Sequence, residues 1–315
     1  MHQSPIDREA ETNQSGSQKH IVLVDTDIGD DIDDALALAL VLRSPEIDLQ
    51  GVTTVFGNTL QRARLAAHLL QIFDRADVPI AAGIETPLLL RHRPSGVPQA
   101  AILDDRAKLP AVSARSGPAL IIEAALAYYG RLSVICLGPL TNIATALRLE
   151  PRLFMAIGSI MMMGGTSGFP MPEWNVRSDA QAAQIVLGAG IPVTMVGWNV
   201  TMRCQLRERD IQRLQRDGSP QAQLLNHLLA TWRRHRPRWH SELPYLHDPL
   251  TVAALCCPEL FQFAEMTVRV PTHGLLKGFM LPRLLNGPLI HAAVSVQVEE
   301  AREWVMHRLL TPSSP

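Results

Sequence analysis

The chain has 315 residues, of which 47% are hydrophobic and 19% are charged, and its formal net charge is -1. This length is enough to bury a sizeable core, either as one large α/β domain or as two smaller ones. The nearly balanced charge gives no electrostatic reason to expect nucleic acid or an anionic membrane as a partner, so a small neutral or polar substrate fits better.

The ends of the chain and its cysteines indicate a soluble, cytoplasmic protein. Residues 1–19 are polar and contain no apolar run of the kind found in signal peptides, so they are predicted to be a disordered tail. No apolar run approaches the ~20 residues that a membrane-spanning helix needs. Residues 20–311 show no repeat or linker and are predicted to form a single domain. Four cysteines without CxxC spacing are expected to be reduced thiols: Cys136, Cys204, Cys256 and Cys257.

Strand and helix patterns alternate along the chain. The predicted strands cover residues 21–24, 47–56, 78–82, 132–137, 159–163, 193–196, 265–270 and 292–298. Predicted helices cover residues 35–42, 208–216, 221–236 and 299–309, and others follow Thr59 and Asp179 as caps or begin at Ser116, after Asn142 and at His247.

Two stretches without a clean period are predicted to be loops. Residues 88–110 are rich in Pro, Arg and His, and a loop of this length in a compact domain is usually functional or mobile, so the segment is a lid candidate. Residues 164–175, GGTSGFPMPEWN, form a Gly/Pro loop that a core would not need.

The alternation predicts an α/β fold with an open, mostly parallel, mixed sheet covered by helices on both faces, similar to a Rossmann core. In such sheets, ligands bind outside the carboxyl ends of the strands. Four polar clusters lie at those ends: DTDIGDD, GN, GPLTN and GGTSGFPMPEWN. Their convergence predicts an active site at this edge of the sheet.

The densest cluster is DTDIGDDIDD, which places six aspartates in the ten residues between the first strand and the first helix. A single aspartate at such a position is usually a cap or turn residue, and Asp33 and Asp34 suit a helix start because the macrodipole favours negative charge there. Six packed carboxylates repel one another, however, so the cluster predicts a bound cation. Oxygen-only ligands favour Ca²⁺ or Mg²⁺.

The acidic turn, Asn58, GPLTN, the MGG…EWN loop and HDP, in this order, resemble the inosine-uridine preferring nucleoside hydrolase family. The resemblance runs from about Val22 to Pro249. It implies a calcium-dependent enzyme that hydrolyses the N-glycosidic bond of ribonucleosides, releasing ribose and a free purine or pyrimidine base. It also implies a nucleoside hydrolase-like fold, a role in nucleoside salvage and a homodimer or homotetramer.

The family pattern DxDxGxDD, followed by a helix, is matched here with two extra residues, Asp30 and Asp31. If the helix start fixes the alignment, the resemblance assigns calcium binding to Asp27, Asp34, the backbone carbonyl of Thr141, and Asp248, and ribose binding to Asp33. An ungapped alignment would instead place Asp31 at a site position, and it would place Ile32, which has no ligand atom in its side chain, at the position of a metal ligand. Without the resemblance, GPLTN is a loop in which Asn142 caps a helix.

Further site residues follow from the same resemblance. Asp27 corresponds to the residue that takes a proton from a metal-bound water, and His247 to the residue that protonates the leaving base. The positions matching substrate-binding residues are Asp33, Asn58, Met163, Glu173, Asn175 and Asp248. Residues 166–172 lack an asparagine that the family often carries.

The side chains around the base are less defined. In the family, a region rich in aromatic residues typically closes over the base, and here it contains Trp232, Trp239 and Tyr245. Aromatic residues at such spacing are more often part of a core. His92 lies near a position where many relatives carry HGxxG. The sequence here is RHRPSGV, which does not match that motif.

The implied reaction is direct attack of water, as in inverting glycosidases, with no covalent nucleophile. Two other interpretations remain open. The DTD sequence after an apolar strand superficially matches a haloacid dehalogenase-like phosphohydrolase, although none of the three lysines, Lys19, Lys108 and Lys277, precedes a later acidic pair. The chain could also be a calcium-dependent binding protein, as an inactive family member; an EF-hand is excluded because its twelfth position would be Leu36 or Leu38.

Overall fold

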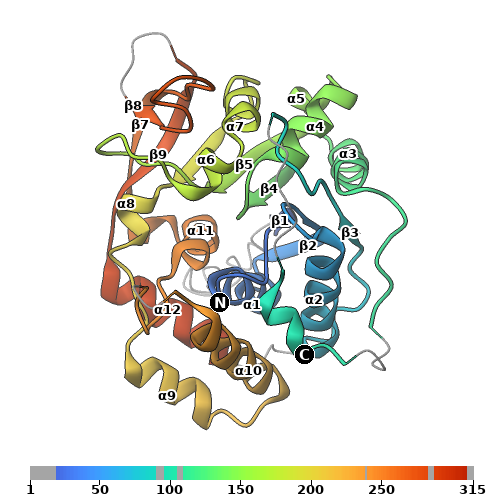
Figure 1. Cartoon of the computed structure of the whole chain (residues 1–315), viewed down its shortest axis with the longest axis vertical. Helices are drawn as coiled ribbons and strands as arrows, with labels where there is room; N and C mark the ends of the chain where they lie inside the picture. Colours follow the sequence, from blue (N-terminus) through green and yellow to red (C-terminus); the bar gives the residue numbers. More distant parts are fainter. Residues whose placement is uncertain (1–18, 90–95, 105–108, 238–239, 283–286, 311–315) are drawn as a thin grey trace, which may run out of the picture.

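A mixed sheet of nine strands runs through the part of the chain that the computed structural model describes, residues 19–89, 96–104, 109–237, 240–282 and 287–310 (Figure 1). The strands are β1 (His20–Thr26), β2 (Ile47–Thr54), β3 (Ile80–Ala82), β4 (Leu132–Cys136), β5 (Ile157–Met163), β6 (Val193–Val196), β7 (Phe261–Arg269), β8 (Leu281–Pro282) and β9 (Leu289–Val296). Their order across the sheet is β3-β2-β1-β4-β5-β6-β9-β7-β8.

The pairings from β3 across to β9 are parallel, and only β7 runs antiparallel to its neighbours β9 and β8. β1 lies between β2 and β4, and its residues from Val22 to Thr26 are buried. A parallel sheet needs cover on both faces, which explains the continuous apolar run of β1. The predicted α/β fold with a mostly parallel, mixed sheet is confirmed.

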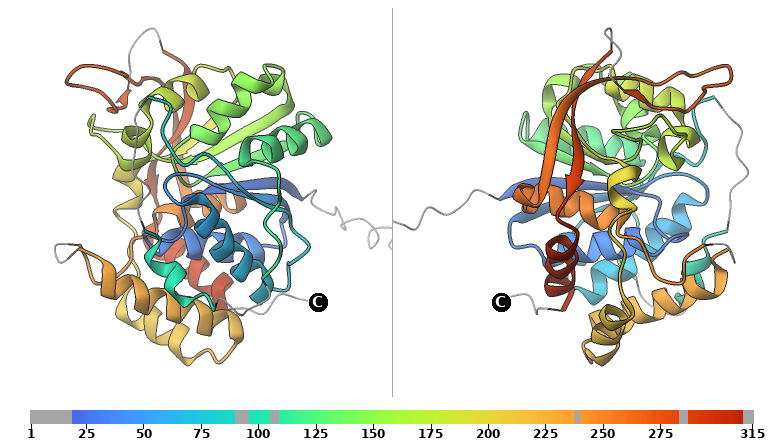
Figure 2. Two further views of the ribbon diagram at one scale, coloured as in Figure 1. Left: turned by 45° about the vertical axis from the view of Figure 1, so that its right-hand side comes forward. Right: turned by 90° about the vertical axis from the view of Figure 1, so that its left-hand side faces the viewer.

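Helices cover both faces of the sheet (Figure 2). The helices are α1 (Asp33–Arg43), α2 (Thr59–Ile72), α3 (Gly117–Ala127), α4 (Thr141–Leu149), α5 (Leu153–Ala156), α6 (Trp174–Ser178), α7 (Ala180–Leu187), α8 (Trp198–Thr201), α9 (Glu208–Arg216), α10 (Pro220–His235), α11 (His247–Cys256) and α12 (Val298–Leu310), with short 3₁₀ helices η1 (Pro98–Ile102) and η2 (Pro258–Leu260). One buried cluster joins α1, α2, α10, α11 and α12 to the sheet, and a second joins α3, α4 and α7.

Local capping decides where several helices begin. Ser116 accepts a hydrogen bond from Ala119 N ahead of α3, and Asp179 accepts one from Ala182 N ahead of α7, as predicted. The predicted cap Thr59 is wrong, because Asn58 caps α2 by accepting from Gln61 N at 3.1 Å. Asn142 is not a cap either, since Leu140 occupies the N-cap of α4.

Several boundaries differ from the sequence-based expectations. The predicted loop 164–175 ends in α6, which begins because the buried carboxylate of Glu173 accepts hydrogen bonds from two backbone N–H groups of its first turn. The short helices α5 and α8 carry too few residues to show a helical period. β7 and β9 each begin earlier than expected, because their antiparallel register, which runs from Phe261 opposite Val296, sets their ends.

Part of the lid candidate packs against the acidic turn. Within residues 88–110, η1 lies next to this turn, and Gln99 N donates to Gly29 O at 3.1 Å. Residues 90–95, including His92, and residues 105–108 lie outside the described part of the chain. Among the described helices, none combines the length and the apolar character needed to cross a membrane.

The buried side chain of Asn142 ties the carboxyl ends of the first strands together. Its Nδ2 donates to Asp25 Oδ1 at 2.7 Å and to Thr54 O at 3.0 Å, and its Oδ1 accepts from Ile84 N at 2.8 Å. Residues far apart in the sequence therefore meet at one amide, at the edge of the sheet where the polar clusters gather.

Replacement of Asn142 tests this junction. We expect Asn142→Ala to lower the free energy of unfolding by about 3 kcal/mol, because it leaves buried polar groups of three segments without a partner. Urea unfolding measures the loss. Asn226→Ala is the control, since the Asn226 side chain donates to Leu214 O at 2.8 Å and joins only neighbouring helices, and its loss should cost about 1 kcal/mol. Equal losses in the two variants would contradict the role given to Asn142.

Candidate active site

A cavity of about 570 Å³ opens where the central parallel strands end. Its lining includes residues that end or directly follow β1, β4, β5 and β6: Asp27, Leu137, Met163 and Trp198. The first helical turns of α1, α6 and α11 also line it. The carboxyl ends of parallel strands are the usual place for a ligand in an open α/β sheet. The cavity therefore lies where the sequence predicts the site.

Three buried carboxylates form the floor of this cavity. Asp33 and Asp34 come from the first turn of α1, and Asp248 comes from the first turn of α11, which packs against α1. One oxygen from each lies within 4.8 Å of the others. Asp34 Oδ1 also accepts a hydrogen bond from Thr26 Oγ1. The turn and the HDP sequence, which are more than 200 residues apart, thus form one acidic site.

The electrostatics of the floor favour a bound cation. Burial raises the pKa of Asp34 to about 7. Burial, followed by the charges of neighbouring aspartates, raises the pKa values of Asp27, Asp33 and Asp248 well above the usual range. Carboxylates that resist ionisation together are neutralised by a hard, oxygen-seeking cation. The donor set present therefore fits a divalent ion of the calcium type.

Asp27 lies beside this cluster and faces the same cavity. The charge of Asp34 raises the pKa of Asp27, and that of Arg62 lowers it, although burial is the largest cause. The GPLTN loop passes close by, because a Cβ built on Gly138 would lie 2.9 Å from Asp27 Oδ1. Asp27 is therefore placed between the acidic floor and the loop that contains Thr141.

Two predicted site residues do not line the cavity in the described part of the structure. Asn58 uses its side chain to cap α2. Thr141 is buried at the start of α4, where its Oγ1 donates to Asp179 Oδ2 at 2.8 Å and its carbonyl accepts from Thr145 Oγ1 at 2.7 Å. The roles predicted for them, in substrate and metal binding, stay predictions.

The loop between β5 and α6 forms one wall. Asn175 Nδ2 donates to Leu137 O at 2.7 Å and to Met163 O at 3.2 Å, and this fixes the amide while Asn175 lines the cavity. The Glu173 carboxylate also lines the cavity, but it accepts from the backbone N–H groups of Gly165, Asn175 and Val176. Glu173 therefore also shapes this wall.

His247 enters the cavity from the first turn of α11. Its Nδ1 lies 2.6 Å from Thr201 Oγ1, and its ring is tilted against Tyr245 with centroids 5.6 Å apart. Burial, and then the charge of His240, lowers the pKa of His247 to about 4. The ring is therefore neutral at pH 7, and Tyr245 supports it without lining the cavity itself.

The C-terminal end of α10 and the chain after it form the opposite wall, which the sequence predicted only through Trp232. Trp232 does line the cavity, whereas Trp239 lies outside the described residues. The lining residues that were not predicted include Thr166, Met171, Trp198, His235, Arg236 and His240. They follow the ends of strands and helices, where no periodicity shows the direction of a side chain. A search for aromatic and basic residues near helix ends would have found four of them.

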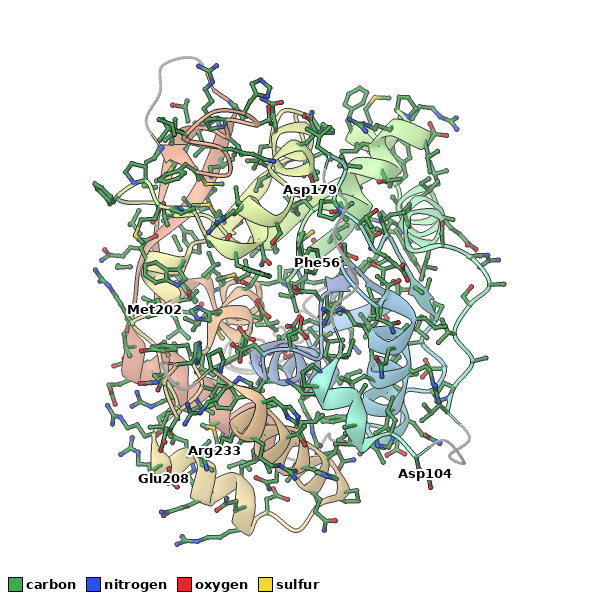
Figure 3. All side chains as sticks on the ribbon, viewed as in Figure 1. Phe56, Asp104, Asp179, Met202, Glu208 and Arg233 are labelled. Atoms are coloured by element: carbon green, nitrogen blue, oxygen red, sulfur yellow. The ribbon has the colours of Figure 1, made fainter. Side chains whose placement is uncertain are left out.

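Arg62 of α2 holds the acidic turn in place and is fully buried. Its Nε donates to Phe56 O at 2.7 Å, its Nη1 donates to Asp27 O and to Ile28 O, and its Nη2 lies 2.7 Å from Asp30 Oδ2. Figure 3 shows Phe56 near the centre of the molecule, and its ring meets Trp174 edge to face at 6.1 Å. The first inserted residue, Asp30, thus pairs with an arginine outside the acidic floor.

Replacement of Arg62 tests whether its hydrogen bonds hold the acidic turn in place. We expect Arg62→Met to lower the free energy of unfolding by about 3 kcal/mol or more, because buried carbonyls lose their donor, and to weaken divalent-cation binding. Urea unfolding and calorimetry measure the two effects. The matched control is Arg75→Met, which removes a surface pair with Asp77 at 3.0 Å and should cost at most about 1 kcal/mol. If Arg62→Met loses no more free energy of unfolding than Arg75→Met, Arg62 does not hold the turn.

The raised carboxyl pKa values predict how stability depends on pH. A folded-state pKa of about 7 for Asp25 and Asp34, against 3.8 ordinarily, means that the folded protein keeps protons that the unfolded chain releases. The contribution of these two carboxyl groups to the stability of the metal-free protein should therefore be largest below pH ~4. It should fall as the pH rises from about 4 to about 7. Added calcium should restore Tm above pH ~7, because it binds the ionised carboxylates. Thermal melts across this range, with chelator and with calcium chloride, test this; a metal-free Tm that rises up to pH ~7 would oppose it.

Comparisons with known proteins agree with this geometry. Residues 22–303 match the family model described as inosine-uridine preferring nucleoside hydrolase. The chain is 33% identical to a probable uridine nucleosidase 2 of Arabidopsis thaliana, over 94% of this chain and 98% of that protein. It is 35% identical to the pyrimidine-specific ribonucleoside hydrolase RihA of Photobacterium profundum, over 80% and 85% of the two chains.

Solved structures show the same fold. A plant nucleoside hydrolase, PpNRh1, superposes with a TM-score of 0.83 at 28% identity, covering 93% of this chain and 99% of its own. A purine-preferring ribonucleoside hydrolase from Gardnerella vaginalis gives 0.80 at 26% identity, with 92% and 98% covered. The fold, the acidic cavity and these matches agree, and the chain is therefore a nucleoside hydrolase that belongs to the inosine-uridine preferring nucleoside hydrolase family.

Proposed function

We propose that this protein uses a bound calcium ion to hydrolyse the N-glycosidic bond of ribonucleosides, with uridine among its substrates. The observation that carries the proposal is the floor of the cavity, where oxygens of Asp33, Asp34 and Asp248 lie within 4.8 Å of one another. The names of the relatives above, a uridine nucleosidase and a pyrimidine-specific hydrolase, support uridine as the first substrate to test.

The metal would be held by Asp27, Asp34 and Asp248, together with the carbonyl of Thr141 if the family assignment holds. When bound, calcium would neutralise the carboxylates, orient the sugar and make a water molecule more acidic. Asp27 is the proposed base, because its carboxylate faces the cavity beside the acidic floor and can accept a proton from the attacking water.

The chain's own side chains would position the ribose. Asp33 and Asp248 can accept hydrogen bonds from sugar hydroxyls, and Asn175 can do the same through Oδ1 because its Nδ2 is already bonded to backbone carbonyls. Met163 provides an apolar contact for the sugar ring. Glu173 and Asn58 remain proposed substrate residues on the strength of the family resemblance.

His247 is proposed to act on the leaving base. In the tautomer with its hydrogen on Nε2, Nδ1 accepts from the Thr201 hydroxyl and Nε2 can donate a hydrogen bond to the base. The haloacid dehalogenase alternative has no support at this site: Asp25, the nucleophile it requires, is fully buried and bonded to Thr53 and Asn142. The single catalytic domain of residues 20–311, the cytoplasmic location and the homo-oligomer remain proposals from the sequence.

Ribose release from uridine, cytidine, inosine, adenosine and guanosine tests the function. We expect uridine to be hydrolysed without added phosphate, and chelation to lower the rate by about 10²-fold or more because the acidic floor loses its cation; added calcium should restore it. Asp34→Asn should show the same loss, and Asp48→Asn, an exposed position on β2, should not. No release from any nucleoside would refute hydrolysis and leave an inactive nucleoside-binding protein as the alternative.

A further inference from the structure

The second inserted aspartate, Asp31, faces the cavity and has no part in the reaction described above. It lies in the turn before α1, and it lines the cavity together with Trp232 and His240 from the opposite chain segment. An acidic residue, an indole and an imidazole at one end of a substrate cavity are unusual for a purely structural cluster, because burying a carboxylate is costly unless it is used.

Three contacts fix Asp31. Its Oδ1 accepts a hydrogen bond from Ile32 N at 2.7 Å, and its carboxylate also accepts one from the indole N–H of Trp232. Its backbone carbonyl accepts from Gln99 Nε2 at 2.5 Å. Trp232 and Gln99 are both buried. The carboxylate is therefore held rigidly, and it differs from Asp30, which pairs with Arg62.

The same indole positions His240. The two rings meet edge to face, with centroids 6.0 Å apart and an interplanar angle of 88°. The backbone around His240 is also fixed, since its N–H donates to Pro237 O and its carbonyl accepts from Arg236 Nη1, each at 2.9 Å. Burial raises the pKa of Asp31, and the charge of His240 acts in the opposite direction and lowers it. Trp232 thus joins a carboxylate and an imidazole into one unit.

This unit lies at the end of the cavity away from the sugar wall. The wall with Met163 and Asn175 belongs to β5 and α6, whereas Trp232 and His240 belong to α10 and the segment after it. Figure 1 shows α6 and α10 on opposite sides of α11. A ribose held between the acidic floor and the α6 wall, as proposed above, would leave the α10 end of the cavity for the base.

Other charged groups near His240 are already engaged. The Arg236 guanidinium lies 3.0 Å from Glu242 Oε1, and His235 Nδ1 lies 2.9 Å from the carbonyl of Thr231 in its own helix. His247 faces His240 from α11. Asp31 is a carboxylate that lines the cavity together with His240 and Trp232.

We propose that His240 donates the proton that the leaving base takes up, and that Asp31, held by Trp232, is the positioning residue that orients His240. This assignment rests on the proposed hydrolase reaction. As the bond from C1′ to the base nitrogen breaks, its electron pair stays with the nitrogen, which accepts a proton from His240. Water forms the new bond to C1′ and gives its proton to Asp27. Solvent then returns a proton to His240 and removes one from Asp27, so that the overall change is nucleoside plus water to ribose plus base.

The experiment compares leaving groups that differ in their need for a proton. His240→Gln and Asp31→Asn, assayed with calcium, should each lower kcat for uridine, by about 10²-fold or more for His240→Gln, the usual contribution of a general acid, and by a smaller factor for Asp31→Asn. Hydrolysis of p-nitrophenyl riboside, whose leaving group departs without a proton, should change little in either variant. Trp232→Phe, which removes the indole N–H donor and keeps an aromatic ring of smaller size, should show the same selectivity more weakly. His227→Gln, at an exposed position on α10, is the control and should behave as the unmodified protein.

The outcomes separate this proposal from the function on which it rests. Equal losses for both substrates would show that the pair is only structural and would overturn the proposal. Unchanged uridine hydrolysis in His240→Gln, or selectivity found in His247→Gln alone, would also overturn it. If the unmodified protein hydrolyses neither substrate, the proposed hydrolase function fails instead. Restoration of uridine hydrolysis in His240→Gly by added imidazole would support His240 as the donor, because a structural defect does not respond to a small base.

Discussion

The mutual repulsion of buried carboxylates is the constraint on which this structure depends. Asp33, Asp34 and Asp248 come so close at the ends of two packed helices that burial and neighbouring charge raise their pKa values together. Such an arrangement lowers the stability of the isolated fold unless a cation or protons neutralise it. The surrounding structure is accordingly stiff: α1 is buried along most of its length, and it packs against α11 and α12.

Polar side chains buried beneath the site provide the stiffness that apolar packing alone would not. Arg62 donates to the carbonyl of Ile28 in the acidic turn and to that of Phe56 after β2, and Asn142 joins the ends of β1 and β2 to the segment after β3. Both side chains are fully buried. Because an unpaired buried polar group is costly, each such network also fixes one geometry for the carboxylates above it.

The two inserted aspartates show how one turn can serve two purposes. Asp30 turns toward Arg62 and becomes part of the scaffold, whereas Asp31 turns toward Trp232 and His240 and becomes part of the cavity. Gly29 precedes them with a φ of +121°, and a Cβ there would lie 2.1 Å from Val97 Cγ1, so the turn requires glycine at this position. The two inserted residues bring the turn into contact with α2, η1 and α10.

The α/β class, the mostly parallel sheet and the family could be predicted before the structure, because alternating apolar periods and the ordered motifs are local properties of the chain. It also identified the carboxylates that the structure brings together, since the turn and HDP stand at element ends. The folded chain was needed to reveal the partners of Asp30 and Asp31, the capping role of Asn58 and the part of the cavity lined by Trp198, His235 and His240. Those contacts join residues far apart in the chain, and their side-chain directions depend on how helices pack, which no local pattern encodes.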